Sequence, residues 1–414
     1  MYDFAFDKTT LRAAFIARDF EQNPTLAAPA ISDQIILDAL QKTVAGFGPI
    51  AFKSAIVRKN RLYQFNDLSD EIVVRKLARN IRRLTRVKQS DRETIIRSIR
   101  LLLEEGHDYR VYRLDIRRFY ESISCSAVTS ALSRDLGFPP ASLKIWNSFD
   151  AQLSAQAIDG MPRGIAISAT IAEYVMRNFD RQLKMREQVY FYARYVDDIV
   201  ILTKAKEDAA MFREEIEKHL PVGLSLNFKK CKTFTFSTAP LAKASPFAIE
   251  HKFDFLGYQF TVSKPRNPKD SSREVRLDIS PAKATRFKTR MTLALRQFSK
   301  DLDFGDFVAR INLLAGNYNV YDRSSGHRRN VGIYFNYNLA DFATSEALQD
   351  LDRFWKRLVL AKSGKQAAAL AGKLSKQQRN TLLSKSFVRA FELKTFFDYR
   401  LPEVSRLTRC WAYA

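Results

Sequence analysis

The chain has 414 residues, 46% of them apolar, so it is long enough for two or three compact units and too apolar to be a disordered tail. Its 68 Lys and Arg exceed its 45 Asp and Glu, and the formal net charge of +23 predicts nucleic acid rather than a membrane surface as partner, because the basic residues are spread along the whole chain. Three widely spaced cysteines, four scattered histidines, no signal pattern and no apolar run of about 20 residues exclude a disulfide framework and a spanning helix and favour a cytoplasmic protein.

The first third of the chain predicts helices and one basic hairpin. Residues 32–45 and 70–87 carry apolar side chains at helical spacing. Residues 51–65 are apolar at both ends and basic at the centre, which predicts two strands joined by a tight turn. A solvated basic loop is an equally good interpretation of the three cations at its tip, which are Arg58, Lys59 and Arg61.

The strand predicted over residues 111–116 holds the first candidate catalytic residue. Side chains alternate along a strand, so Tyr112, Leu114 and Ile116 share one face and Asp115 lies on the other. Asp115 therefore points away from the apolar face, close to the end of the strand. Taken alone, it is better explained as a capping acid.

A loop with two glycines follows at residues 159–164. Gly160 and Gly164 permit close approach of the backbone to a ligand, and an ordinary loop-to-helix junction explains them equally well. A helix is predicted directly after this loop, over residues 166–179.

The segment 190–203 places two adjacent carboxylates between two apolar, β-branched runs. The runs predict a hairpin with Asp197 and Asp198 at its tip. Two neighbouring negative charges repel each other, and a divalent cation offsets that repulsion. A surface turn is the alternative interpretation, but the flanking residues are too apolar for one and no Gly or Asn completes the turn.

Beyond this hairpin the pattern predicts a helix over 207–220 and a strand over 223–236 that carries Lys230. A further apolar strand, interrupted by Gly257, is predicted over 253–260, and the polar stretch 264–274 predicts a hinge. The remainder is predicted to be mostly helical, with three apolar stripes that start at Ser280-Pro281, Phe307 and Leu348; the second of them runs to Tyr318.

Asp115 precedes Asp197 by 82 positions (197 − 115), and both residues fall at strand ends in a basic protein. Two such strands side by side would bring three carboxylates to one place. That arrangement is typical of a two-metal site for phosphoryl transfer, in which the ions lie about 4 Å apart.

At this point the sequence resembles reverse transcriptases. The family's catalytic hairpin is matched by YVDD at 195–198, its first carboxylate motif by RLDIRRFYESI at 113–123, and its template-gripping motif by GMPRG at 160–164 with Ser168. Residues 226–230 resemble the lysine motif, and FLG at 255–257 resembles the primer-grip turn.

The resemblance implies an α/β (α+β) fold of the right-hand polymerase type, with an antiparallel-sheet palm, helical fingers and a helical thumb. Residues 1–110 would be an N-terminal extension and fingers. Residues 111–263 would be the palm with an inserted fingers segment, and residues 275–414 the thumb and C-terminal region.

The resemblance also implies roles for single residues. Asp115, Asp197 and Asp198, with the backbone carbonyl of Ile116, would bind two Mg²⁺ ions. Tyr120 would be the steric gate against a ribose 2′-hydroxyl. The other nucleotide-binding candidates are Gly164, Lys230, Arg58, Lys59 and Arg61, and the template-binding candidates are Pro162, Arg163, Gly164 and Ser168.

The implied activity is RNA-directed DNA synthesis from dNTPs on an RNA template. The amino-acid sequences of the motifs are most similar to those of bacterial abortive-infection and defence-associated enzymes, including the smaller polymerase of a type 3 two-polymerase system. This implies phage defence with a noncoding RNA, a DNA product, and a second reverse transcriptase subunit or a second copy of the chain as partner.

The template-gripping motif departs from the family in one position. Arg163 stands where the family usually has Gln, so a charge replaces a neutral amide. This departure leaves open a template-independent or RNA-synthesising polymerase on the same palm. A non-catalytic nucleic-acid-binding scaffold is the other alternative, although a scaffold has no need of three carboxylates where a polyanion approaches.

Overall fold

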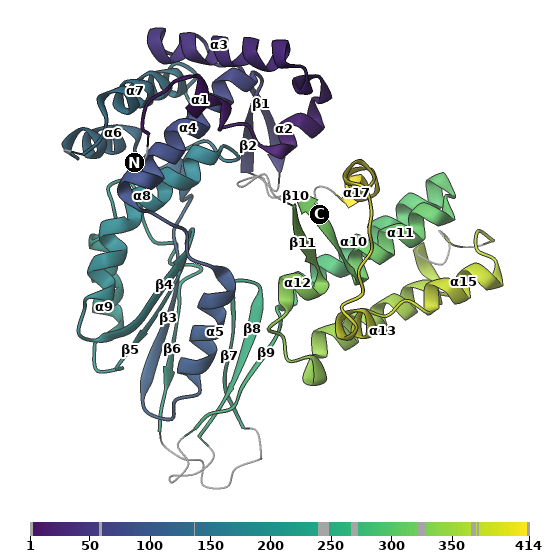
Figure 1. The fold of residues 1–414 in the computed structure, drawn as a ribbon. Helices are drawn as coiled ribbons and strands as arrows, with labels where there is room; N and C mark the ends of the chain where they lie inside the picture. Colours follow the sequence, from purple (N-terminus) through teal and green to yellow (C-terminus); the bar gives the residue numbers. More distant parts are fainter. Residues whose placement is uncertain are drawn as a thin grey trace. The chain divides into compact units, whose positions relative to one another are not determined.

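The computed structural model describes residues 3–57, 60–135, 137–238, 248–265, 272–321, 328–365, 370 and 372–411. These residues form two compact units, whose elements are labelled in Figure 1. The first unit consists mainly of Met1–Arg92 and Asp108–Phe236. The second consists mainly of Glu93–His107, Ser237–Asp322 and Arg328–Ala414.

Helices and one hairpin make up much of the first unit. The helices are α1 (Lys8–Arg12), α2 (Ala17–Gln22), α3 (Pro29–Ala45), α4 (Leu68–Thr85), α6 (Cys125–Arg134) and α7 (Pro140–Ala155), with 3-10 turns η1 (Pro24–Ala27) and η2 (Tyr120–Ser122). The helix predicted over 32–45 begins earlier, because Pro29 has the fixed φ that suits a first helical position. The hairpin predicted over 51–65 is confirmed as β1 (Phe52–Val57) and β2 (Asn60–Phe65), while Arg58 and Lys59 lie outside the described residues.

A four-stranded antiparallel sheet carries the candidate catalytic residues. It contains β3 (Tyr109–Asp115), β4 (Val189–Tyr195), β5 (Asp198–Thr203) and β6 (Lys232–Phe236), in the order β4-β5-β3-β6. Helices α8 (Ala166–Lys184) and α9 (Ala209–Lys218) pack on this sheet (Figure 1). The Phe179 ring of α8 lies 6.3 Å from the Tyr192 ring, and the Phe212 ring of α9 lies 5.0 Å from the Tyr112 ring.

The strand predicted over 223–236 is confined to its last part. The Asn227 carbonyl accepts hydrogen bonds from the N–H groups of Lys230 (2.8 Å) and Cys231 (3.0 Å), which closes a turn. Only Leu226 pairs with the sheet before β6, through an isolated bridge to Ile116. The alternation of apolar residues in this stretch therefore reflects one bridge and a turn.

The second unit contains a three-stranded antiparallel sheet of β7 (Ile249–Phe255), β8 (Tyr258–Ser263) and β9 (Val275–Ile279), together with α5 (Arg92–Leu103). The stretch predicted as one strand over 253–260, interrupted by Gly257, forms two strands, and the interruption is the turn of a hairpin. Leu256 and Gly257 both have positive φ, 45° and 86°, and turn the chain into a hairpin. Two consecutive positive φ values are typical of a type I′ turn, which suits Gly.

The rest of the second unit is mostly helical. Its elements are α10 (Pro281–Asp301), α11 (Phe304–Ala315), β10 (Asn317–Tyr321), β11 (Arg328–Gly332), α12 (Ile333–Tyr337), η3 (Phe342–Thr344), α13 (Glu346–Val359), α15 (Lys376–Leu383), α16 (Phe387–Glu392), α17 (Leu401–Thr408) and η4 (Arg409–Trp411). The three predicted apolar stripes meet in its core, where the Phe307 ring lies 4.8 Å from Phe298 and 6.1 Å from Trp355. The second stripe is shorter than predicted, because α11 ends at Ala315 and Tyr318 lies in β10.

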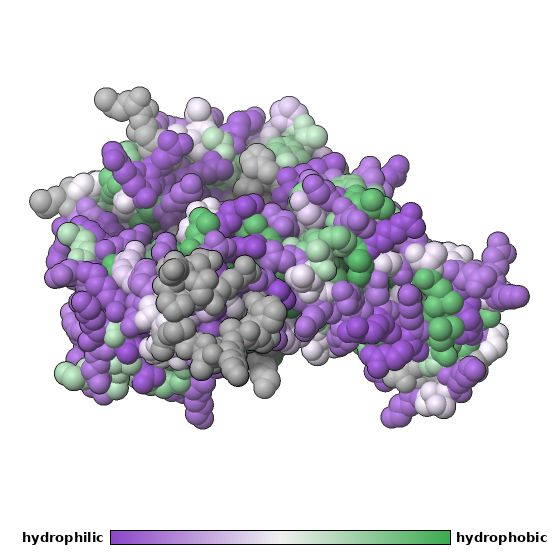
Figure 2. Space-filling model, turned by 90° about the horizontal axis from the view of Figure 1, so that it is seen from below, coloured by the Kyte–Doolittle hydropathy of each residue, from purple (hydrophilic) through white to green (hydrophobic). Residues whose placement is uncertain are grey.

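Among the described helices, none is both long and apolar enough to cross a membrane. The face in Figure 2 is mostly hydrophilic, with apolar residues in small separate patches. This surface agrees with the high share of charged residues in the sequence, 27%.

Candidate active site

The register of the central strands brings the three candidate aspartates together. Asp115, the last residue of β3, is the pairing partner of Asp198, the first residue of β5. The Ile116 N–H donates to the Asp197 carbonyl over 3.1 Å, which ties the end of β3 to the hairpin turn. Tyr112, Leu114 and Ile116 belong to the core beneath the sheet, so Asp115 lies on the opposite face, as its alternation predicts.

The turn that carries the acids has an unusual backbone. Tyr195 pairs with Asp198, so Val196 and Asp197 form a two-residue hairpin loop. Val196 has a φ of 60°, a region that β-branched residues rarely adopt and that costs about 1–3 kcal/mol. The surrounding structure must therefore hold this turn in place.

Arg194 of β4 provides that support from below the turn. Its Nη1 donates to the Val196 carbonyl over 3.1 Å. Its other donors reach two carboxylates of α8, with Nη2 2.6 Å from Glu173 Oε2 and 2.8 Å from Asp180 Oδ2. Arg194 is only 4% exposed, and a buried guanidinium between two carboxylates fixes both partners in position. The hairpin is thereby anchored to α8.

Asp197 and Asp198 are half-buried, and their negative charges lie near each other. Burial, followed by the neighbouring Asp197, raises the pKa of Asp198 to about 6. Burial also raises the pKa of Asp197, and the charge of Asp115 adds to that effect. A cation between these groups would relieve both effects.

Asp115 is 8% exposed and both its oxygens have partners. The Asn227 amide donates to Oδ1, and Lys230 Nζ lies 2.9 Å from Oδ2. The turn at residues 227–231 thus brings these two side chains to the candidate catalytic residue Asp115. Lys230, predicted on a strand, reaches Asp115 from a turn, with its side chain 60% exposed.

Among the described residues, no group of three or more His, Cys, Asp or Glu side chains is arranged so that it could hold a metal ion. The donor set nevertheless suits Mg²⁺, which prefers carboxylate oxygens and keeps several waters. Asp115, Asp197 and Asp198 would hold the ions, and Ile116 lines the same cavity as Asp115 and Asp197. Lys230 would have to release Asp115 when a cation binds.

A cavity of about 560 Å³ opens beside the acids. Basic side chains line it together with Asp115 and Asp197, and they are Arg61, Arg117, Arg118, Arg163 and Lys230. Arg61 is exposed at the start of β2 and is the one predicted hairpin cation within the described residues. Carboxylates on one side and cations around them are the charge pattern that a metal-bound triphosphate needs.

The glycine loop lies tightly against two neighbouring segments. A Cβ on Gly160 would come within 2.5 Å of the Tyr120 and Glu121 carbonyls, and one on Gly164 within 2.6 Å of the Tyr63 carbonyl. Both glycines also have positive φ, 62° and 100°. Close backbone packing is therefore enough to explain why both positions are glycine, whether or not they also contact a ligand.

Two predicted template-binding residues have internal partners. The Ser168 hydroxyl, 1% exposed, donates to the Pro162 carbonyl over 2.7 Å and so holds the loop onto α8. Arg163 forms a two-pronged ion pair with Glu121, with Nε 2.6 Å from Oε1 and Nη2 3.0 Å from Oε2. Its charge is therefore compensated within the protein.

Several functional neighbours were not found from the sequence. Glu121 lies within a quoted motif, but its partner is 42 positions away. The anchor formed by Arg194 with Glu173 and Asp180 depends on how α8 packs on β4, and Asn227 depends on a turn that was interpreted as a strand. Glu173 and Asp180 are seven residues apart, a spacing that places both acids on one face of a helix, and this was the signal available in the sequence.

A known protein family matches the part of the chain that contains these residues. The profile of the family described as reverse transcriptase (RNA-dependent DNA polymerase) matches residues 58–260, a span that includes Asp115, Asp197, Asp198 and Lys230. The chain thus carries a domain of the nucleotidyltransferase class. More closely, that domain is a reverse transcriptase domain, and its helices and antiparallel sheets are consistent with a right-hand polymerase fold.

A solved structure of apo telomerase from Candida tropicalis, truncated from its C-terminal domain, is similar to this chain at 13% identity and a TM-score of 0.31. The match covers 46% of this chain and 43% of the telomerase chain, so the chain spans less than half the length of that relative. No curated protein shows significant similarity to the chain.

Proposed function

We propose that the chain is an RNA-directed DNA polymerase that adds dNTPs by two-metal phosphoryl transfer. The observation that supports this most strongly is the pairing of Asp115 with Asp198, next to the Ile116–Asp197 hydrogen bond, at the mouth of a basic cavity. The match to the reverse transcriptase family over the same residues supports the choice of template and substrate.

The proposed site uses Asp115, Asp197 and Asp198, with the Ile116 carbonyl, as ligands of two Mg²⁺ ions. When bound, such ions lower the pKa of the primer 3′-hydroxyl and neutralise the charge that develops on the leaving pyrophosphate. Lys230, released from Asp115, would donate to the triphosphate and its leaving group. In each of these roles, a positive charge of an ion or of Lys230 lies where the reacting atoms develop negative charge.

The remaining residues would hold the nucleotide and the template. Tyr120 would close the space beside the ribose 2′-position, and Gly164 would let the backbone approach the base pair. Arg61, with Arg58 and Lys59, would contact the triphosphate from the hairpin. Pro162, Arg163 and Ser168 would shape the template path, the last two through their internal bonds rather than by direct contact.

Metal-dependent primer extension tests the proposal. The purified chain is given poly(rA)–oligo(dT), dTTP and Mg²⁺, and we expect DNA synthesis that EDTA abolishes. The Asp197→Ala/Asp198→Ala variant should lose at least about a thousandfold in rate, because two ligands of both ions are gone. Equal synthesis by the double variant would contradict the assignment.

We also propose that the enzyme works in the cytoplasm in antiphage defence, with a noncoding RNA as template or scaffold and a second reverse transcriptase subunit or a second copy of the chain as partner. The amino-acid sequences of the motifs, which resemble those of defence-associated reverse transcriptases, support this second proposal. Sequencing the nucleic acid that purifies with the chain tests it, since a discrete RNA joined to complementary DNA is expected. DNA without an RNA complement would favour template-independent synthesis, and RNA bound without any synthesis would favour a scaffold.

A further inference from the structure

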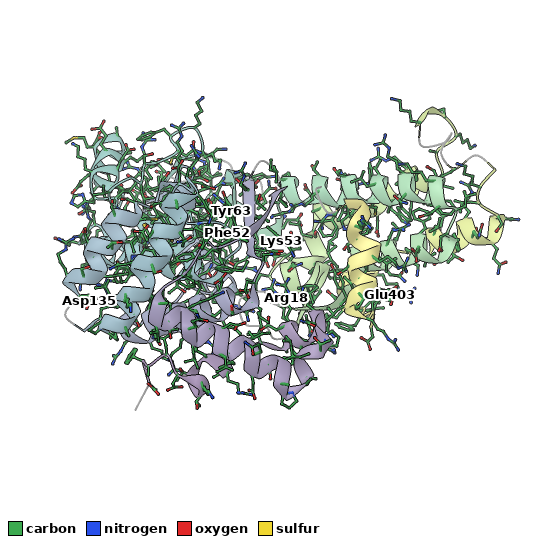
Figure 3. All side chains as sticks on the ribbon, turned by 90° about the horizontal axis from the view of Figure 1, so that it is seen from above. Arg18, Phe52, Lys53, Tyr63, Asp135 and Glu403 are labelled. Atoms are coloured by element: carbon green, nitrogen blue, oxygen red, sulfur yellow. The ribbon has the colours of Figure 1, made fainter. Side chains whose placement is uncertain are left out.

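Three segments of the first unit meet at Arg163. Its carbonyl accepts the Tyr63 N–H of β2 over 2.7 Å, while its side chain reaches Glu121 in η2. One residue further back in that turn, the Tyr120 carbonyl accepts the Met161 N–H over 2.8 Å. Figure 3 shows Tyr63 beside Phe52 on the hairpin, and their rings lie 5.9 Å apart. Arg163 therefore has a fixed backbone on one side and a fixed partner on the other.

The Arg163 side chain also covers the Tyr120 ring. Its guanidinium carbon lies 5.2 Å from the ring centroid, within the range of a cation–π contact. The Phe119 ring meets the Tyr120 ring edge-on at 5.4 Å. Because Glu121 directly follows Tyr120, the ring, the carboxylate and the guanidinium form a closed triangle. The ion pair holds the guanidinium over the ring, so a ring that rotates away loses its cation–π contact.

This triangle lies where two cavities adjoin. Arg163 lines both the cavity of about 560 Å³ that holds the acids and a second cavity of about 570 Å³ beside α8. Tyr120 lines the second cavity and Glu121 the first. In the proposed polymerase the sugar of the nucleotide would lie at this junction, where a 2′-hydroxyl differs from a hydrogen by one oxygen atom only. Discrimination of that size needs a ring that does not shift.

The ion pair has the properties of a fixed support. Both side chains are about three-quarters buried, with 23% of Arg163 and 25% of Glu121 exposed. The guanidinium fork meets both carboxylate oxygens, the geometry that best resists rotation. The hydrogen bond from Arg163 lowers the pKa of Glu121, and the pKa of Arg163 is raised by the same bond, so both groups stay charged near neutral pH.

We propose that the Glu121–Arg163 ion pair fixes the Tyr120 ring and thereby sets how strongly the enzyme rejects ribonucleotides. This inference rests on the proposed polymerase function. Glu121 and Arg163 are positioning residues, since they act through the ring. Arg163 accordingly replaces the family's neutral amide with a charge that holds the Tyr120 ring on the nucleotide side of the site.

The test is a discrimination ratio measured for each variant. On poly(rA)–oligo(dT) with Mg²⁺, kcat/KM for dTTP is divided by kcat/KM for ribothymidine triphosphate. We expect Glu121→Gln and Arg163→Gln each to lower this ratio about tenfold, and the double variant to lower it no further, because residues of one pair are coupled. Arg163→Lys, which keeps the charge without the fork, should lower it as well.

A matched control exists on the same unit. Arg177 of α8 pairs with Asp135, labelled in Figure 3, over 3.2 Å and lies 4.3 Å from the Tyr174 ring, yet it lines neither cavity. Arg177→Gln should leave the ratio unchanged, and Tyr120→Ala should give the largest loss. Thermal melting of every variant identifies any that fail to fold.

The outcomes separate the inference from the proposed function. A ratio that falls with Tyr120→Ala but not with Glu121→Gln or Arg163→Gln would overturn the inference and leave the polymerase in place. Loss of RNA affinity in Arg163→Gln, with a smaller salt dependence and an unchanged ratio, would assign Arg163 to the template and also overturn it. If the wild type incorporates neither nucleotide, the proposed function fails and the inference fails with it.

Discussion

Replacing Asp198 with Asn should stabilise the protein when no metal is present. Asp198 is half-buried, and burial together with the neighbouring Asp197 raises its pKa from 3.8 to about 6. At pH 7 the folded chain must keep this carboxylate ionised in a place that disfavours the charge. An amide of nearly the same shape removes the charge and keeps the volume.

The size of the effect follows from that pKa difference. A rise from 3.8 to about 6 corresponds to about 3 kcal/mol. Water reaches part of the group, so we take about 1–2 kcal/mol as the expected gain in unfolding free energy. For a unit of this size the gain raises Tm by roughly 2–8 °C.

The pH dependence has a definite sign. A carboxyl whose pKa is raised in the folded state binds its proton more tightly there than in the unfolded chain, so its destabilising effect is complete above about pH 6 and disappears as the pH falls toward 3.8. The difference in Tm between Asp198→Asn and wild type should therefore be largest at pH 7 and smaller at pH 5. Mg²⁺ should stabilise the wild type more than the variant.

Calorimetry in EDTA measures the effect. Glu187→Gln is the control, because that carboxylate is 96% exposed and its removal should change Tm very little. If Asp198→Asn melts at or below the wild-type temperature in EDTA at pH 7, burial and the neighbouring Asp197 do not destabilise the ionised Asp198 carboxylate as this reasoning requires.

Three further substitutions test the supports of the site. Arg194→Met leaves two carboxylates of α8 buried without their cation and should cost about 3–5 kcal/mol by denaturant unfolding, whereas a loss below 1 kcal/mol would show that the anchor is not needed. Gly160→Ala puts a Cβ 2.5 Å from backbone oxygens and should cost about 2 kcal/mol, while Gly48→Ala, with open space around it, should not; equal melting of the two would be inconsistent with the packing. Lys230→Met frees Asp115 from its ion pair and should tighten Mn²⁺ binding about twofold to fivefold without nucleotide, as read by titration; weaker binding would mean that Lys230 does not compete with the metal.

Much of the geometry of the candidate site could be predicted because it follows from strand rules. Alternation placed Asp115 away from the apolar face, and the apolar runs around Asp197 and Asp198 predicted a hairpin. Once β3 and β5 pair, the acids meet, so two local patterns and one register suffice. The apolar stripes of α10, α11 and α13 were predictable for the same reason, since helical periodicity is local.

The errors and omissions involve backbone turns and long-range pairs. A strand was expected through Lys230 because apolar residues alternate there, but hydrogen bonds to the Asn227 carbonyl close a turn, and alternation alone does not reveal such a turn. The positive φ of Val196 contradicts its local preference and persists because Arg194 holds the turn. The Glu121–Arg163 pair joins residues 42 positions apart, a contact that no periodicity encodes.

Counting bound ions tests the central claim most directly. Electron paramagnetic resonance with Mn²⁺ and a non-hydrolysable dNTP analogue measures how many ions each chain holds in the presence of a template–primer. We predict two Mn²⁺ ions per wild-type chain and at most one in Asp197→Ala/Asp198→Ala, because Asp115 alone cannot hold both. Two ions in the double variant, or fewer than two in the wild type, would contradict the assignment of Asp115, Asp197 and Asp198 as a two-metal site.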